Sequence, residues 1–133
     1  MTVLTAPAEL RATRQFDQET INRYADLVGD HNPIHVDEEF ARSTPFGGTI
    51  AHGMLVLSLA SNMLEKQFGD RWRASGKLKV RFKAPTKSGA TVTAQASLKE
   101  GEQPADNKIA TYRVECRNEQ REVVIVGTAQ VTL

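Results

Sequence analysis

The sequence predicts an α+β fold in which a curved antiparallel β-sheet wraps around one long central α-helix. Two observations predict it: an apolar segment from Ile50 to Phe68, and a C-terminal half made of strand-like runs. A helix that is apolar almost all round is normally buried, and successive strands joined by short turns normally pair antiparallel. The sheet is therefore expected to curl around a helix over residues 52–66. The 133 residues fit one domain, which we place at 1–133.

Composition narrows the class of protein. The chain is 40% apolar and 25% charged with a net charge of +1, so nothing global points to nucleic acid or to a membrane surface. The longest apolar stretch, Ile50 to Leu64, contains polar residues and is too short to span a bilayer of roughly 30 Å. The N-terminus lacks the apolar core of a signal peptide, and Cys116 is the single cysteine. We expect a cytoplasmic protein without a disulfide.

The first helix is predicted over residues 18–28, after a short strand or extended segment at 10–16. Asp17 is a good N-cap, and Phe16 and Ile21 stand at the positions of a hydrophobic staple. Apolar residues then recur at helical spacing until Gly29, a typical C-terminal stop. This helix delivers Asp30 just past its end.

A turn follows at Asn32-Pro33, because a proline disfavours the helical region for the residue before it. A short helix is predicted over residues 37–41, which the run STPFGG at 43–48 ends. The central helix then runs to Phe68, and Gly69-Asp70 terminates it.

Four strands are predicted after the central helix, joined as an antiparallel meander. The run 77–83 alternates strictly between charged and apolar residues, the pattern of a half-buried strand. Strands at 92–98, 109–116 and 123–133 follow, with a polar loop at 101–107 and a turn at 118–120. A single curved sheet leaves its open side uncovered, so we expect a homodimer or a higher homo-oligomer of dimers.

Asp30 and His35 are the candidate acid–base pair. Taken singly, either residue is more often a cap or an ordinary polar loop residue. The Asn32-Pro33 turn can fold both onto one side of a cleft, and both side chains titrate in a range useful for proton transfer. Asn32 could bridge them or fix a water molecule.

The run His52-Gly53-Met54 supplies a second element. If Gly53 lies in the first helical turn, its N–H is free and faces outward with the positive end of the helix dipole behind it. A carbonyl oxygen placed there would be stabilised as it becomes an enolate. The alternative is that Gly53 merely allows tight packing. Ser61 lies eight residues on and roughly on the same face, although a bond to the carbonyl four residues earlier explains it more simply.

Other chemistries find less support. The histidines lack zinc-protease spacing, there is no CxxC, and no nucleophile elbow, phosphate loop or dinucleotide fingerprint occurs. We therefore expect no metal and no cofactor. The basic residues of 77–83 share one face, usually the solvated side of an edge strand, although Arg81 and Lys83 could instead contact the phosphates of a carrier.

The segment YADLVGDHNPIHVDEEFARSTPFGGTIAHGM, residues 24–54, closely resembles the signature of MaoC-like dehydratases, the (R)-specific enoyl-CoA hydratases of the hot-dog fold. The resemblance implies a hot-dog fold, dimerisation and a thioester substrate. It implies that Asp30 and His35 are the catalytic pair and that the Gly53 amide forms the oxyanion site. Asn32 would support the hydration machinery, and Ser61 matches a position near the substrate in some members. His52, beside Gly53 in the sequence, is our own further candidate for a substrate-binding or supporting residue.

The resemblance implies reversible (R)-specific hydration of trans-2-enoyl-CoA to (R)-3-hydroxyacyl-CoA, with coenzyme A or acyl carrier protein as the carrier. Dehydration of hydroxyacyl groups on acyl carrier protein in fatty-acid synthesis is an alternative with the same site. Thioester hydrolysis is disfavoured because Ile50 to Leu64 contains neither Asp nor Glu. A non-catalytic acyl-CoA-binding module would not need both Asp30 and His35.

Overall fold

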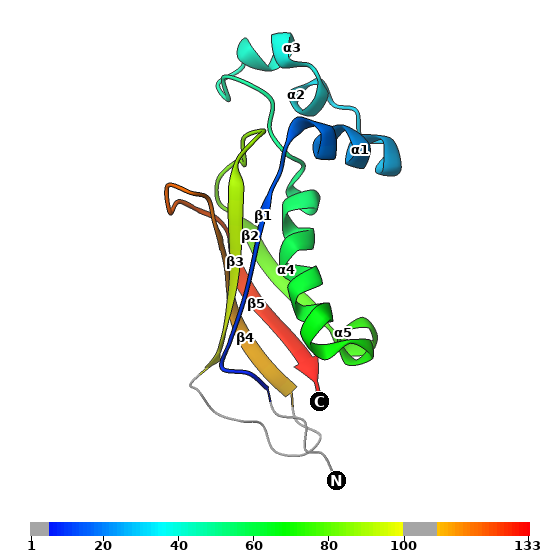
Figure 1. The fold of residues 1–133 in the computed structure, drawn as a ribbon, viewed down its shortest axis with the longest axis vertical. Helices are drawn as coiled ribbons and strands as arrows, with labels where there is room; N and C mark the ends of the chain where they lie inside the picture. The colour runs from blue at the N-terminus through cyan, green and yellow to red at the C-terminus, as the bar shows by residue number, and fades with distance from the viewer. Residues whose placement is uncertain (1–5, 100–108) are drawn as a thin grey trace.

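The computed structural model describes residues 6–99 and 109–133, in which a five-stranded antiparallel sheet curves beside one long helix, as predicted (Figure 1). The strands are β1 (Glu9–Gln15), β2 (Lys77–Phe82), β3 (Thr91–Leu98), β4 (Ile109–Arg117) and β5 (Val123–Thr132). The helices are α1 (Gln18–Val28), α2 (Pro33–Val36), α3 (Glu38–Arg42), α4 (Gly53–Phe68) and α5 (Asp70–Ser75). The predicted loop at 101–107 lies outside the described residues.

The strand order is β1-β3-β4-β5-β2, so the predicted meander is correct for β3, β4 and β5 and wrong for β2. Instead of pairing with β3, β2 runs along β5, with Val80 opposite Gly127. A Cβ atom at residue 127 would clash with the backbone of Lys79 and Val80, so glycine is what permits this close approach. Local periodicity identifies strands but not their partners, which is why the sequence missed this pairing.

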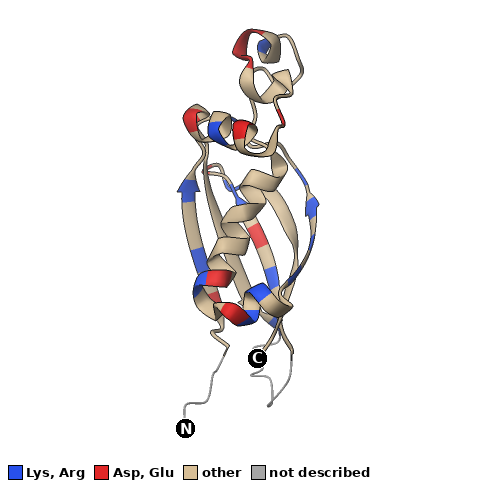
Figure 2. Ribbon diagram, turned by 90° about the vertical axis from the view of Figure 1, so that its right-hand side faces the viewer, with Lys and Arg blue, Asp and Glu red and all other residues tan. Residues whose placement is uncertain are grey.

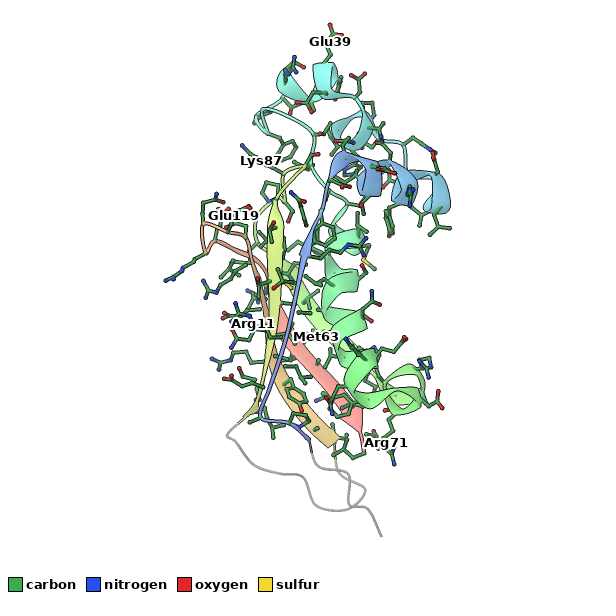
Figure 3. All side chains as sticks on the ribbon, viewed as in Figure 1. Arg11, Glu39, Met63, Arg71, Lys87 and Glu119 are labelled. Atoms are coloured by element: carbon green, nitrogen blue, oxygen red, sulfur yellow. The ribbon has the colours of Figure 1, made fainter. Side chains whose placement is uncertain are left out.

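The core lies between α4 and the inner face of the sheet. From α4 it receives Leu55, Val56, Leu59, Ala60, Met63, Leu64 and Phe68. The sheet contributes alternating residues, among them Val92, Ala94 and Ala96 of β3. Met63, labelled in Figure 3, lies between helix and sheet. Each fully buried side chain of Leu or Val size contributes about 1.5–3 kcal/mol.

The helices before α4 form a segment that projects beyond the end of the sheet, with Glu39 at its tip (Figures 1 and 3). Asp17 caps α1 by accepting from the Thr20 amide at 2.8 Å, and the staple residues Phe16 and Ile21 are fully buried. Gly29 ends α1 with a φ of 78°. Asn32 lies outside the helical region, as predicted for the residue before a proline, and the turn leads directly into α2, because proline suits the first helical position.

Charge is unevenly distributed over the fold. Figure 2 shows much of α4 without charged residues, whereas lysines and arginines lie on the strands. On β2, Lys77, Lys79 and Arg81 are exposed and alternate with the half-buried Leu78 and Val80. Among the described residues, no helix is both long enough and apolar enough to cross a membrane.

Candidate active site

The structure brings Asp30 and His35 together. Gly29 turns the chain at the end of α1, and α2 then carries His35 back toward Asp30. The Oδ2 atom of Asp30 lies 4.0 Å from Nε2 of His35. The Asp30 carboxylate is about half exposed, whereas His35 is only 8% exposed. An acid and an imidazole therefore face each other at the edge of the protein interior.

Hydrogen bonds define the orientation of His35. Its Nδ1 atom is 2.8 Å from the carbonyl oxygen of Ile50. A carbonyl can only accept, so Nδ1 carries a hydrogen, and in the neutral ring Nε2 is the acceptor that faces Asp30. The His35 backbone carbonyl in turn accepts from the side-chain amide of Gln18 at 2.8 Å. These bonds fix the orientation of the ring toward the site.

Gly53 is the first residue of α4, as predicted. Its N–H has no acceptor within the helix because of its position in the first turn. His35 and Gly53 both line a cavity of about 330 Å³, whose other walls include Val56, Phe82 and Ile125. A Cβ atom on Gly53 would lie 3.0 Å from the Phe82 ring. Gly53, whose amide has no acceptor within the helix, therefore lines a mostly apolar cavity beside the imidazole.

His52, the residue before α4, contacts both members of the pair. Its Nε2 atom is 3.0 Å from the backbone oxygen of Asp30, and its ring stacks on His35 with centroids 3.8 Å apart. The edge of Tyr24 packs against it with centroids 4.9 Å apart. His52 is 4% exposed and does not line the cavity.

Two supporting residues have other partners than the sequence suggested. Asn32 does not bridge the pair; its Oδ1 accepts from the Ile34 amide at 3.2 Å and caps α2. Ser61 accepts from the indole N–H of Trp72 at 3.2 Å, in place of the expected bond to the fourth preceding carbonyl. Trp72 lies on α5, a helix that the sequence analysis missed. Ser61 does not line the cavity beside His35 and Gly53, and its role near the substrate stays a prediction.

The two candidate phosphate contacts are separated by the end of β2. The assigned strand ends at Phe82, and Lys83, which is exposed like the cations of β2, follows it with its backbone N–H still bonded to Val124 at 2.8 Å. Lys83 lines the cavity, whereas Arg81 lies on β2 opposite Val126 and does not line it.

Asp30, His35 and His52 could offer a metal ion three ligand atoms that lie within 4.8 Å of one another. The two rings are stacked with planes 27° apart, so their lone pairs run nearly parallel. A single ion could not lie about 2.1 Å from a nitrogen in both ring planes. One nitrogen of each ring also faces a backbone carbonyl. The group is better suited to proton transfer, and the absence of a metal stays a prediction.

The sequence analysis missed a polar network behind His35. The Thr49 hydroxyl lies 2.6 Å from Gln18 Oε1 and 2.9 Å from Glu38 Oε2, and the Thr49 amide also donates to Glu38. These bonds hold the pKa of Glu38 below its usual value. Phe82 was missed too, although it is the last apolar residue of the alternating run. The network joins residues from three segments, so no local pattern could reveal it.

Comparison with known proteins identifies the family. The sequence model of the MaoC like domain matches residues 2–120. The chain belongs to the MaoC-like family. The fold agrees: the (R)-hydratase from A. caviae involved in PHA biosynthesis superposes with a TM-score of 0.83 at 28% identity, covering 99% of this chain and 98% of that one. The hot-dog fold is thereby confirmed.

Similar sequences carry names from one area of chemistry. The chain is 44% identical over 85 residues to 3-hydroxyacyl-thioester dehydratase Z of Mycobacterium tuberculosis, a match that covers 61% of this chain and 56% of that protein. The chain thus matches little more than half the length of that relative. It is 37% identical to the (R)-specific enoyl-CoA hydratase of Rhodospirillum rubrum, covering 89% of this chain and 80% of the relative.

Proposed function

We propose that this MaoC-like protein catalyses the reversible, (R)-specific hydration of trans-2-enoyl thioesters to (R)-3-hydroxyacyl thioesters. The observation that carries the proposal is the 4.0 Å approach of Asp30 Oδ2 to His35 Nε2, next to the free amide of Gly53. An imidazole and an electrophilic amide that line one cavity, with a carboxylate 4.0 Å from the imidazole, match the needs of adding water to a polarised double bond. The names of the relatives support the same chemistry.

Water activation follows from the two acceptors. A carboxylate and an unprotonated Nε2 can each accept one hydrogen of a single water molecule, which holds its oxygen lone pairs free to attack. Asp30 takes one proton as the water oxygen bonds to C3 of the substrate. His35 holds the other hydrogen and fixes the direction of attack.

The electrons of the double bond move toward the thioester carbonyl, whose oxygen becomes an enolate. The Gly53 N–H, with the positive end of the α4 dipole behind it, stabilises that negative charge. The enolate then collapses as C2 takes up a proton from the same side, which leaves the 3-hydroxyacyl thioester and restores Asp30. The reverse sequence removes water, and no step requires a cofactor.

The decisive experiment is a crotonyl-CoA hydration assay on the wild type, Asp30→Asn and His35→Ala. We expect either substitution to lower kcat by roughly 10³-fold, because each removes a proton acceptor. His31→Ala is the matched control, since His31 is exposed and pairs with Asp26 instead. Full activity in both variants would contradict the mechanism, and an inactive wild type that binds acyl-CoA would indicate a binding module.

Hydroxyacyl groups on acyl carrier protein are the second candidate substrate, and the two carriers share a phosphopantetheine phosphate. Lys83 at the cavity is the better placed cation for it, with Arg81 as the comparison. We expect Lys83→Ala to raise KM for crotonyl-CoA several-fold with kcat unchanged, and Arg81→Ala to have less effect. Parallel assays with crotonyl-CoA and crotonyl-acyl carrier protein distinguish the carriers.

A second copy of the chain is proposed to complete the site. Phe82 is 52% exposed and Met54 is 60% exposed. The Phe82 ring lies beside Gly53 in the fold, and Met54 follows Gly53 in the sequence. Phe82 belongs to β2, an edge strand of the sheet in which Leu78 and Val80 are only half buried. A homodimer joined here would cover this apolar surface and exclude water from the cavity. Sedimentation of the wild type against Phe82→Glu tests it, since a charge in a buried interface should favour the monomer.

A further inference from the structure

The side chain of His52 contacts the candidate catalytic residues rather than the cavity. Its ring covers one face of His35 at 3.8 Å, and its Nε2 reaches the Asp30 backbone at 3.0 Å. Gly53 is its neighbour in the chain. One residue thus touches the acid, the imidazole and the start of α4.

The hydrogen-bond partners of His52 define its tautomer. Because a backbone carbonyl can only accept, the hydrogen of the ring is on Nε2. Nδ1 is then left with a lone pair, and no donor or acceptor among the described residues reaches it. A buried nitrogen without a partner is unfavourable. An apolar ring would avoid that cost, so packing alone does not explain a histidine here.

We propose that His52 is a positioning residue that holds Asp30 and His35 in register with the Gly53 amide. Its N–H binds the carbonyl oxygen of Asp30, whose own backbone N–H is bonded to Ala25 at 3.1 Å, so Asp30 is held from both sides in an exposed connection between α1 and α2. Its ring face limits the tilt of His35, whose own hydrogen bond to Ile50 fixes only one end of the imidazole. The inference rests on the proposed hydration and adds to it the means by which the pair is oriented.

Orientation has a defined kinetic signature. A displacement of about 1 Å in a catalytic group can cost 10²-fold in rate. Since His52 does not line the cavity, its loss should lower kcat and leave substrate affinity nearly unchanged. A partial loss of folding would also lower the apparent kcat at an unchanged KM, so kcat is expressed per folded protein, and only a loss of positioning should alter the placement of the two rings.

The experiment separates the two contacts of His52 by substitution. His52→Phe keeps a ring and loses the donor, His52→Gln keeps a donor and loses the ring, and His52→Ala loses both. We expect kcat for crotonyl-CoA to fall roughly 10- to 100-fold in His52→Phe, with KM within about 3-fold, and furthest in His52→Ala. His31→Phe is the matched control and should stay within about 2-fold of wild type. A folded His52→Phe with wild-type kcat would overturn the proposal.

Nitrogen-15 NMR of the histidine rings gives a second readout that needs no activity. The wild type should show the hydrogen on Nε2 of His52 and on Nδ1 of His35, and His52→Ala should shift the His35 ring protons as the stacked ring is removed. The opposite tautomer of His52, or unmoved His35 resonances, would overturn the inference even if His52→Phe did not fold. A wild type without hydratase activity would refute the proposed function alone, because the NMR result still decides the placement of the rings.

Discussion

The sheet with α4 and the projecting segment of α1, α2 and α3 are held together by different forces. In the first region, alternating apolar side chains pack against the central helix. In the second, side chains bond to backbone at nearly every turn: Asp17 caps α1, Asn32 caps α2 and Asp37 caps α3. Asp30 and His35 belong to the second region, and Gly53 stands where the two meet. The proton-transfer residues therefore lie in a segment held by hydrogen bonds, the polar framework of α1–α3. This segment packs on the apolar core of α4 and the sheet, which we call the platform.

Truncating the platform should have the largest effect on stability. Leu64 is fully buried between α4 and the sheet, so Leu64→Ala should lower the free energy of unfolding by about 2–5 kcal/mol. Denaturant titration measures the change. Leu27→Ala is the control, since that leucine is 82% exposed on α1 and should shift stability by less than about 0.5 kcal/mol.

Substituting Gly53, which lies where the two regions meet, should lower activity without lowering stability. Gly53→Ala places a methyl group against the half-exposed ring of Phe82, which can rotate away, and alanine suits a helix better than glycine. We expect kcat to fall about 10- to 100-fold as the substrate carbonyl is pushed from the amide, with the melting temperature unchanged or slightly raised. A destabilised but fully active variant would show that the glycine serves packing alone.

Removing hydrogen bonds from the polar framework should destabilise the projecting segment of α1–α3 more than the sheet and α4. Thr49→Val keeps the shape of a 3% exposed side chain but removes the hydroxyl shared by Gln18 and Glu38. We expect a loss of about 1–2 kcal/mol and a several-fold lower kcat. Faster amide hydrogen exchange should be confined to α1–α3. Uniform acceleration across the sheet would contradict the division into two regions.

Lowering the pH should have the smallest effect, and it should again reduce the stability of the polar framework of α1–α3. The pKa of Glu38 is lowered by the hydrogen bonds from Thr49, so the folded state favours the carboxylate. That contribution is fully present above the ordinary value of 4.5 and is lost as the pH falls through the lowered folded value. The protection factors of amide hydrogens in α1–α3, which correct for the pH dependence of intrinsic exchange, should therefore fall as the pH drops below about 4.5 in the wild type. Glu38→Gln should show weaker pH dependence in this segment.

The sequence predicted what local chemistry encodes. Asp17, with its staple of Phe16 and Ile21, predicted the start of α1 correctly, and Gly53 was correctly placed in the first turn of the central helix. The pairing of β2 with β5 was not predicted because it depends on Gly127, nearly fifty residues away in the chain.

The site shows the same division. The proximity of Asp30 and His35 follows from the turn between them, as predicted. The contact between His52 and the Asp30 backbone spans 22 residues and depends on how α4 is seated. Asn32 was expected to bridge Asp30 and His35 or to fix a water molecule, yet its oxygen is used by the N-terminus of α2. The first turn of α2 needs a hydrogen-bond acceptor, and the Asn32 oxygen that fills this need does not bridge Asp30 and His35.

The free edge of β2 links ionic strength to assembly. Lys77, Lys79 and Arg81 all lie on the outer face of this edge strand. In two copies joined antiparallel along β2, the cations of one strand face those of the other, and like charges opposite each other on a sheet repel. Salt screens that repulsion over about 10 Å at 0.1 M. The dimer should therefore tighten as salt is added, and dilute buffer should favour the separate chains.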